Sequence, residues 1–123
     1  MSDVTSADLL ALSRWDTPTI CNGLELVTPE RRAIGFTTEQ MACLDSQLSP
    51  IVGYARTATV RAVTAPTTDR EQVMAQRAGY YEHIAESPGP TISVIQDLDP
   101  HPGFGAFWGE VNTTVHKGLG CIG

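Results

Sequence analysis

Two β-branched runs with a helix-forming segment between them constrain the fold of this chain more than any other feature. Residues 51–62 are rich in Thr and Val and predict a strand, and residues 91–95 predict a second strand buried on both faces. Between them, Thr68–Glu71 has the spacing of a capping box and predicts a helix that ends before Pro90. Strand, helix and strand in this order predict a parallel pair of strands joined by a crossover helix.

The same alternation continues toward the end of the sequence. After a loop rich in Pro, Gly and Asp, residues 106–117 predict a second helix, and Cys121-Ile122 predicts the start of a third strand. The fold class is therefore α/β, with at least part of the sheet parallel. The apolar stripes expected to face the core consist of Val73, Met74, Ala78, Tyr81, Ile84 and Ala85 on the first helix, and Phe107, Val111 and Val115 on the second.

The N-terminal part predicts two short helices before Pro29. Thr5 is the expected N-cap of the first, and Thr17 that of the second, where Pro18 suits the first helical position. Residues 30–50 are expected to be irregular or to form a loop with one weak strand. We expect the whole chain, 1–123, to belong to a single domain.

Composition narrows the classes of function and the cellular location. The 123 residues carry 8 Lys plus Arg against 14 Asp plus Glu, a net charge of −6, which argues against a nucleic-acid partner. No apolar run reaches the length of a membrane span, so no membrane partner is expected. Cys21, Cys43 and Cys121 are an odd number without a Cys-x-x-Cys pair, which favours a reducing, cytoplasmic location; we expect Cys21 and Cys121 in the core.

The junction between the strand at 91–95 and the following helix is the place where chemistry is most expected. Ligands of α/β sheets bind beyond the carboxyl ends of strands, and Gly105 and Gly109 allow close approach of backbone or ligand. Free N–H groups at a helix start favour an anion. Asp97, Asp99 and Glu110 surround the same loop, where three carboxylates could hold a hard divalent cation. The alternative is ordinary structure, because acidic residues favour helix starts and Asp favours turns.

Other polar residues give weaker signals. Arg56 and Arg61 are candidate anion clamps or solvent-facing residues, and the three histidines have no metal-ligand spacing. His83 is expected at the surface or half-buried, and His101 in a solvated loop. His116 is explained by compensation of the helix dipole at the C-terminal end of its helix.

Several stretches of this sequence together resemble the RraA-like family. The most specific runs from Gly105-Ala106-Phe107-Trp108-Gly109-Glu110-Val111 to His116-Lys117-Gly118-Leu119-Gly120-Cys121-Ile122-Gly123. Residues 12–26, with Asp16-Thr17-Pro18-Thr19-Ile20, are similar to the opening helix of the family, and residues 51–60 to its Gly-x-Ala-x-Thr strand. The family includes metal-dependent 4-hydroxy-4-methyl-2-oxoglutarate aldolases that also decarboxylate oxaloacetate.

The resemblance implies a swivelling β/β/α domain, a homotrimer or hexamer, and a lyase that releases pyruvate from a 2-oxo (di)carboxylic acid. Glu110 matches the acidic residue that orders metal-bound water, and Gly109, Glu110 and Val111 match the amides that receive the substrate carboxylate. The implied cofactor is a divalent metal, Mg²⁺ or Mn²⁺, held by Glu110 through water.

One part of the family motif is missing from the sequence. The family has an Arg-Asp pair after twenty further residues, which binds the keto acid and ligates the metal, but only 13 residues follow Glu110. We therefore expect the sequence to be the N-terminal portion of a longer domain, incomplete at its C-terminus, with the direct metal ligand beyond Gly123. The alternative is a natural truncation that has lost the chemistry. The alternative function, from another class, is a non-catalytic RraA-like regulatory or protein-binding domain.

Overall fold

The structure is a computed structural model that describes residues 4–38 and 40–123. Contacts within the chain divide it into two compact units, Met1–Val52 and Gly53–Gly123. Each unit is described by itself. The single domain expected over residues 1–123 stays a prediction.

The first unit contains two short helices, α1 (Ser6–Leu12) and α2 (Thr17–Val27), followed by the single 3-10 turn η1 (Pro29–Arg31). The capping box at the start of α1 is confirmed, because the side chain of Thr5 accepts from the Asp8 N–H and the Asp8 carboxylate accepts from the Thr5 N–H. Residues 32–38 and 40–50 form no strand, so the irregular alternative for this stretch is the correct one. Cys21 is exposed, which makes its expected place in the core wrong.

Helix α2 begins one residue earlier than its predicted cap requires. Asp16 is the N-cap, and its carboxylate accepts a 2.9 Å hydrogen bond from the N–H of Thr19, while Thr17 is already helical. At α3 (Arg70–Ala85) the cap also changes from Thr to the neighbouring Asp, but in the opposite direction: Asp69 rather than Thr68 caps the helix, which begins one residue later than predicted. A carboxylate forms the stronger hydrogen bond and adds a negative charge at the positive end of the helix dipole.

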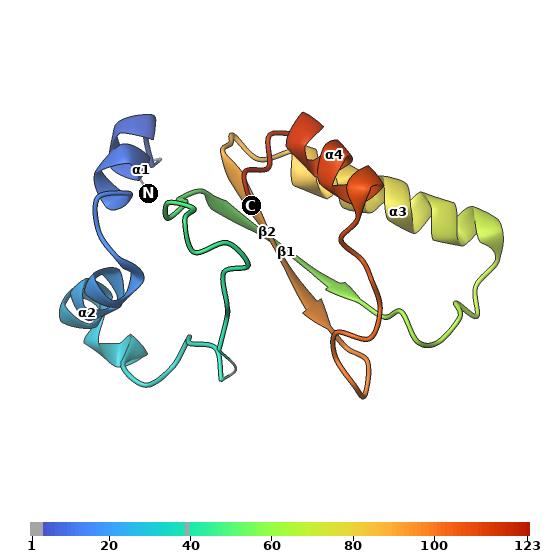
Figure 1. The fold of residues 1–123 in the computed structure, drawn as a ribbon, viewed down its shortest axis with the longest axis horizontal. Coiled ribbons are helices and arrows are strands. Elements are labelled where there is room, and N and C mark those ends of the chain that lie inside the picture. Colours follow the sequence, from blue (N-terminus) through green and yellow to red (C-terminus); the bar gives the residue numbers. More distant parts are fainter. Residues whose placement is uncertain (1–3, 39) are drawn as a thin grey trace. The chain divides into compact units, whose positions relative to one another are not determined.

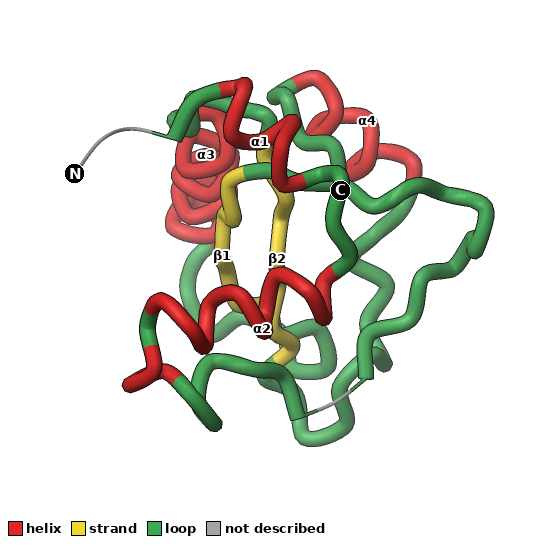
Figure 2. Tube along the Cα trace, turned by 90° about the vertical axis from the view of Figure 1, so that its left-hand side faces the viewer, coloured by secondary structure: helices red, strands yellow, loops and turns green. Residues whose placement is uncertain are grey.

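The second unit contains the parallel pair of strands predicted from the sequence. Strands β1 (Tyr54–Val60) and β2 (Thr91–Asp97) lie side by side (Figure 2). They pair in parallel, with Tyr54 opposite Thr91. On the other edge of β2, Cys121 forms a parallel bridge to Thr91, and the N–H of Ile122 donates to the Thr91 carbonyl at 2.8 Å. The third strand is thus present as a single bridge, and β2 lies between its two neighbours.

Helix α3 joins β1 to β2, and α4 (Glu110–Gly118) lies beside α3 (Figure 1). Helix α4 begins four residues later than the predicted start at 106. Gly109 is its N-cap in an extended conformation, and residues 106–108 approach it as irregular chain. Phe107 therefore packs from the loop before α4.

The prediction that β2 is buried on both faces is wrong. Ser93 and Ile95 face the helices, whereas Val94 and Gln96, on the opposite face, are exposed. Strand β1 alternates in the same way, with its half-buried side chains toward α3. A continuous apolar run is compatible with burial of a strand on one face or on both. Residue type alone therefore does not show whether a second layer covers the strand.

The predicted apolar stripes are also corrected. Met74 is 60% exposed, and on the same helix Ile84 is fully buried beside half-buried Tyr80, so the covered face is turned away from Met74. On α4, Val111 is 72% exposed, while Val115 is half-buried. Polar and aromatic residues occupy much of the space between α3 and α4, which an analysis of apolar spacing alone does not detect.

Two glycines lie where a side chain would collide with a neighbouring segment. A Cβ atom on Gly53 would lie 2.7 Å from the carbonyl oxygen of Pro90, and one on Gly105 would collide with the side chain of Ala62. Gly105 thereby brings the loop after β2 against the end of β1. In the described part of the chain, no helix combines the length and the apolar character needed to cross a bilayer.

Candidate functional site

The start of α4 carries the three residues that the sequence marks as a substrate site. Gly109 is the N-cap and has no side chain, and Glu110 and Val111 open the helix with exposed side chains. The first hydrogen bond of the helix runs from the Thr113 N–H to the Gly109 carbonyl at 3.0 Å. The N–H groups that precede Thr113 in the helix therefore point out of its N-terminal end, where an anion is favoured.

The two aspartates of the preceding loop hold backbone instead of a ligand. Asp97 accepts from the N–H of Asp99 at 2.9 Å and of Gly103 at 2.7 Å, and these bonds hold its pKa below its ordinary value. Asp99 is buried, and one of its oxygens accepts from the N–H groups of Ala62 and Val63 at 2.7 and 2.9 Å. The Asp97 carboxylate thus stabilises the loop from within, and the Asp99 carboxylate links the loop to the chain after β1.

The oxygens of Asp97 and Asp99 that accept these backbone hydrogen bonds are less available to a metal ion. Within residues 4–38 and 40–123, no group of three or more His, Cys, Asp or Glu side chains is placed to hold a metal ion. The arrangement of three carboxylates expected from the sequence is therefore not formed in the described chain. Glu110 is the member of the three that remains exposed to solvent at the helix start.

A buried histidine between α3 and α4 was missed by the sequence analysis. His116 lies in the last turn of α4, as expected, but it is 3% exposed, and compensation of the helix dipole does not explain this burial. Its Nδ1 lies 2.6 Å from the backbone carbonyl of Asn112, and its Nε2 lies 2.5 Å from the hydroxyl of Tyr80. A carbonyl only accepts, so Nδ1 carries the proton and, in the neutral ring, Nε2 accepts from Tyr80.

The hydroxyl of Tyr80 connects this histidine to the sheet. It lies 3.2 Å from the hydroxyl of Ser93 on β2, and burial raises the pKa of Tyr80 above its ordinary value. Because Tyr80 donates to His116, Ser93 is left to donate to Tyr80. The result is a directed chain of hydrogen bonds from β2 through α3 to α4.

Aromatic rings surround His116 on several sides. The ring centroid of Trp108 lies 4.7 Å from that of His116, and Tyr80, Tyr81 and Phe107 follow at 5.5–6.3 Å. The aromatic pairs in the sequence at 80–81 and 107–108 are the signal that could have indicated this cluster. Both nitrogens of His116 are engaged, so the cluster is a structural support for α4 and for the ring of Trp108.

Among the remaining polar candidates, Arg56 contacts helix α3. One nitrogen of the Arg56 guanidinium contacts both the carbonyl oxygen and the Nδ1 atom of His83, and it lies 3.9 Å from the Glu86 carboxylate. Arg56 therefore joins β1 to α3, and its proposed use as an anion clamp is not supported by these contacts. Arg61 and His101 are both exposed.

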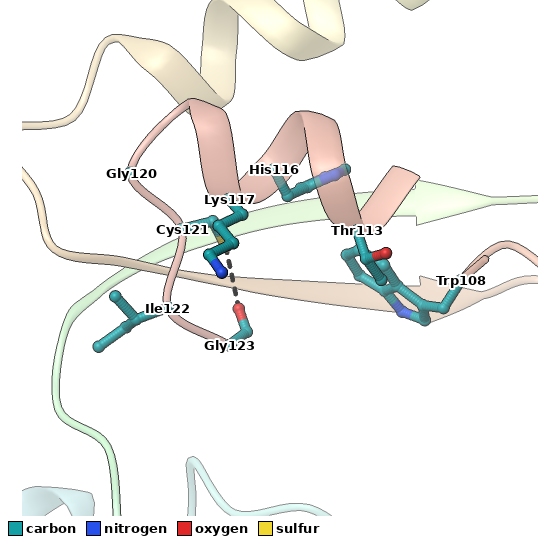
Figure 3. Close-up of a pocket in the computed structure, with 8 residues that line it drawn as sticks. All are labelled: Trp108, Thr113, His116, Lys117, Gly120, Cys121, Ile122 and Gly123. Atoms are coloured by element: carbon teal, nitrogen blue, oxygen red, sulfur yellow. Dashed lines mark hydrogen bonds between the residues drawn. The ribbon is translucent and has the colours of Figure 1, made fainter. Parts of the chain in front are cut away.

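A hollow of about 660 Å³ opens beside α4 and the bridge that follows it. Figure 3 shows the indole of Trp108 at one end and Ile122 at the other, with the amine of Lys117 reaching down beside Gly123. The rest of its lining comes from one side of α4 and from the turn after it: Thr113, His116, Gly120 and Cys121. Most of this surface is apolar.

Comparison of the chain with models of protein families, with curated proteins and with solved structures finds no match in any of the three.

Proposed function

We propose that this chain is part of an RraA-like lyase that releases pyruvate from a 2-oxo (di)carboxylic acid. The observation that carries the proposal is the exposed start of α4, where outward-pointing amide groups and the free Glu110 carboxylate follow directly on the loop after a parallel strand. The resemblance of residues 105–123 to the family adds the reaction class. The swivelling β/β/α architecture is part of the same proposal, of which the mixed α/β fold with a parallel sheet is the coarser form.

Each residue at the start of α4 has a distinct proposed role. The N–H groups of the first turn, from Glu110 and Val111, donate to the substrate carboxylate, and the lack of a side chain at Gly109 leaves room for it. The Glu110 carboxylate accepts a hydrogen bond from a water molecule and orients it to protonate the enolate carbon when pyruvate forms.

The described residues do not complete a site for Mg²⁺ or Mn²⁺. Mg²⁺ requires six oxygen ligands in near-octahedral geometry, and Glu110 is one carboxylate, since Asp97 and Asp99 already accept backbone hydrogen bonds. We propose a metal contact of Glu110 through water, with the direct ligand supplied by another part of the protein or by a neighbouring subunit of a homotrimer or hexamer. When bound, the metal would polarise the 2-oxo acid as a Lewis acid.

The test is release of pyruvate from 4-hydroxy-4-methyl-2-oxoglutarate and from oxaloacetate, with Mg²⁺ or Mn²⁺ and with a metal-only blank. Glu110→Gln is expected to lower turnover about a hundredfold, the usual scale of a lost acid–base group. Glu71→Gln is the matched control, since Glu71 is also an exposed glutamate in the first turn of a helix. Pyruvate release no faster than the blank, or equal turnover in both variants, would contradict the proposal.

A second candidate is a non-catalytic regulatory or protein-binding domain. The first unit favours it, because many of its large apolar side chains are exposed, including Leu24, Leu26, Val27, Ile34, Phe36 and Leu44. Exposed apolar surface of this kind is typical of sites that bind another protein. The test is co-purification of one protein partner in stoichiometric amount. A partner that is lost in Leu26→Ser and retained in the control variant Glu30→Gln, which changes a polar residue, would favour this candidate over the lyase.

We further propose a cytoplasmic location. The described cysteines, Cys21, Cys43 and Cys121, are all free thiols, which is the form that a reducing compartment maintains. Fractionation of cells that produce the protein, with a thiol count on the purified chain, tests the location.

A further inference from the structure

A second hollow, of about 240 Å³, lies between α3 and the sheet. Ala58 and Val60 on β1 and Ile95 on β2 form its floor, toward the carboxyl ends of the two strands, which is the end of a parallel sheet where ligands bind. Its wall includes residues of α3 and Phe107 from the loop before α4. We call it the α3 hollow, and all of its lining belongs to residues 58–107.

Arg77 brings a positive charge to the face of α3 that covers the sheet. It stands one helical turn after Val73 and two turns before the fully buried Ile84, and these spacings place the three residues on one face of the helix. Arg77 and Val73 both line the hollow. The aliphatic stem of an arginine can cover apolar surface, but its guanidinium has five N–H donors that need acceptors.

The part of the chain that the structure describes supplies no acceptor to Arg77, which forms neither an ion pair nor a hydrogen bond there. A helical arginine is commonly paired with an acidic residue three or four positions away. On α3 these positions hold Val73, Met74, Tyr80 and Tyr81. The lining of the hollow contains no Asp or Glu either. The guanidinium is therefore available to an anion from outside the chain.

The rest of the hollow suits an apolar group of limited size. The Tyr80 hydroxyl lies 2.5 Å from Nε2 of His116. The Tyr81 hydroxyl donates to the side chain of Asn112 at 3.0 Å. Both tyrosines therefore present mainly ring carbons to the hollow. One water molecule takes about 30 Å³, so the volume corresponds to about eight atoms of that size.

We propose that the α3 hollow binds a small monocarboxylate with a compact aliphatic body. Its carboxylate pairs with the guanidinium of Arg77, and its body lies against Val60 and Ile95 on the floor. A guanidinium presents its N–H groups in a planar fork that matches the two oxygens of a carboxylate. One cation beside apolar walls also favours a single negative charge over the double charge of a phosphate, because the second charge would lose water without gaining a partner.

The inference does not depend on the proposed function. The ligand needs no 2-oxo group and no metal ion, and the lining of the hollow includes none of Gly109, Glu110 and Val111 at the start of α4.

The experiment is an NMR titration of the metal-free protein with 3-methylbutanoate, followed by the isoleucine methyl signals. Ile95 lines the hollow, whereas Ile92 lies on the opposite face of the same strand. The variants Ile95→Val and Ile92→Val assign the two signals. We expect a saturable shift of the Ile95 signal and no shift of Ile92. Absence of a saturable shift at Ile95, or equal shifts of both signals, would overturn the proposal.

Two further probes separate the charge from the apolar body. 3-Methylbutanamide has the same body without the charge, and we expect it to bind about two- to fivefold more weakly than 3-methylbutanoate, the effect of a partly exposed ion pair. Acetate has the charge without the body, and we expect it to bind at least about tenfold more weakly, because several buried carbon atoms are lost. Equal affinity of the amide refutes the ion pair, and equal affinity of acetate refutes the apolar contact.

The variants Arg77→Met and Arg70→Met test the charge on the protein. Methionine keeps an aliphatic stem, and Arg70 is an exposed arginine at the start of the same helix, outside the lining of the hollow. Arg77→Met is expected to weaken 3-methylbutanoate about two- to fivefold and to leave the amide unchanged. Arg70→Met is expected to change neither affinity. Equal losses in the two variants would refute the role of Arg77.

The variants Ala58→Val and Ala55→Val test the location. Ala58 is on the floor of the hollow, and Ala55 lies on the exposed face of the same strand. Ala58→Val adds two methyl groups within the hollow and is expected to weaken 3-methylbutanoate at least about fivefold. Ala55→Val is expected to leave the affinity unchanged. Equal affinity in the two variants would place the ligand elsewhere and refute the proposal.

Discussion

Replacing Tyr80 by Phe tests the hydrogen-bond chain that joins the sheet to both helices. The change keeps the ring in its aromatic contacts and removes only the hydroxyl, which lies 2.5 Å from Nε2 of His116 and 3.2 Å from the hydroxyl of Ser93. Because His116 is 3% exposed, water does not replace the lost donor. A buried acceptor without a partner costs about 1–3 kcal/mol, so we expect a loss of this size in the free energy of unfolding.

Urea denaturation followed by far-UV circular dichroism measures that loss, and thermal unfolding provides a second measure. For a domain of about 60–100 residues, 1 kcal/mol corresponds to about 4–8 °C in Tm. Tyr81→Phe is the matched control. It removes a 3.0 Å hydrogen bond to the side chain of Asn112, which is half-buried and can accept from water instead. We expect Tyr81→Phe to cost about 0.5–1.5 kcal/mol. An equal or larger loss in Tyr81→Phe would refute the reasoning.

The pKa of Tyr80 adds a dependence on pH to the same experiment. Burial raises the pKa of the folded protein's Tyr80 above that of the unfolded chain, so folding is favoured while the phenol stays protonated. This contribution is complete below about pH 10 and is lost as the pH rises toward the folded pKa. The difference in stability between the wild type and Tyr80→Phe is therefore expected to shrink above about pH 10. A difference that grows with alkaline pH would contradict the assignment.

Further predictions concern a helix cap, a close approach and an acidic residue. Asp69→Ala is expected to cost about 1 kcal/mol in urea denaturation, because α3 loses its N-cap. Gly105→Ala is expected to cost about 1–3 kcal/mol, since the new methyl group collides with Ala62. Its control, Gly79→Ala, has open space in a helix and should stabilise by about 0.5–1 kcal/mol. Asp97 has a lowered pKa, so its contribution to stability is present above about pH 4 and is lost in acid; an unchanged acid transition in Asp97→Asn would refute it.

The order of strands and helices could be predicted because it depends on local patterns. Thr- and Val-rich runs, a cap signal and Pro-Gly breaks are sufficient to place β1, α3 and β2 in sequence, and a helix between two strands favours a parallel crossover. The predicted N-caps of α2 and α3 are each wrong by one residue, and in both places an Asp stands next to the predicted Thr. At both Asp16 and Asp69 the carboxylate took the position that the hydroxyl was expected to hold. Where a charged and a neutral acceptor are adjacent in the sequence, the charged residue is therefore the better prediction for the N-cap.

The environment of His116 could not be predicted, because it depends on contacts between distant residues. In the sequence, His116 and Lys117 stand together near the end of a helix, a pattern that dipole compensation explains fully. Tyr80, whose hydroxyl contacts the His116 ring, is 36 residues away in the sequence. No local spacing relates the two, and only the packing of α4 beside α3 brings their side chains together.

The aspartates after β2 show why a cluster of carboxylates in a sequence is an ambiguous signal for metal binding. Asp97 and Asp99 would have the same spacing whether their oxygens faced a cation or the N–H groups of the loop. The deciding quantity is how many oxygens remain after the backbone is satisfied. Both oxygens of Asp97 and one of Asp99 accept backbone hydrogen bonds, and the other oxygen of Asp99 is buried. Backbone N–H groups outside helices and strands need other acceptors, and the aspartate carboxylates in this loop provide them. Glu110 stands at the start of α4, outside this loop, and its side chain remains exposed to solvent.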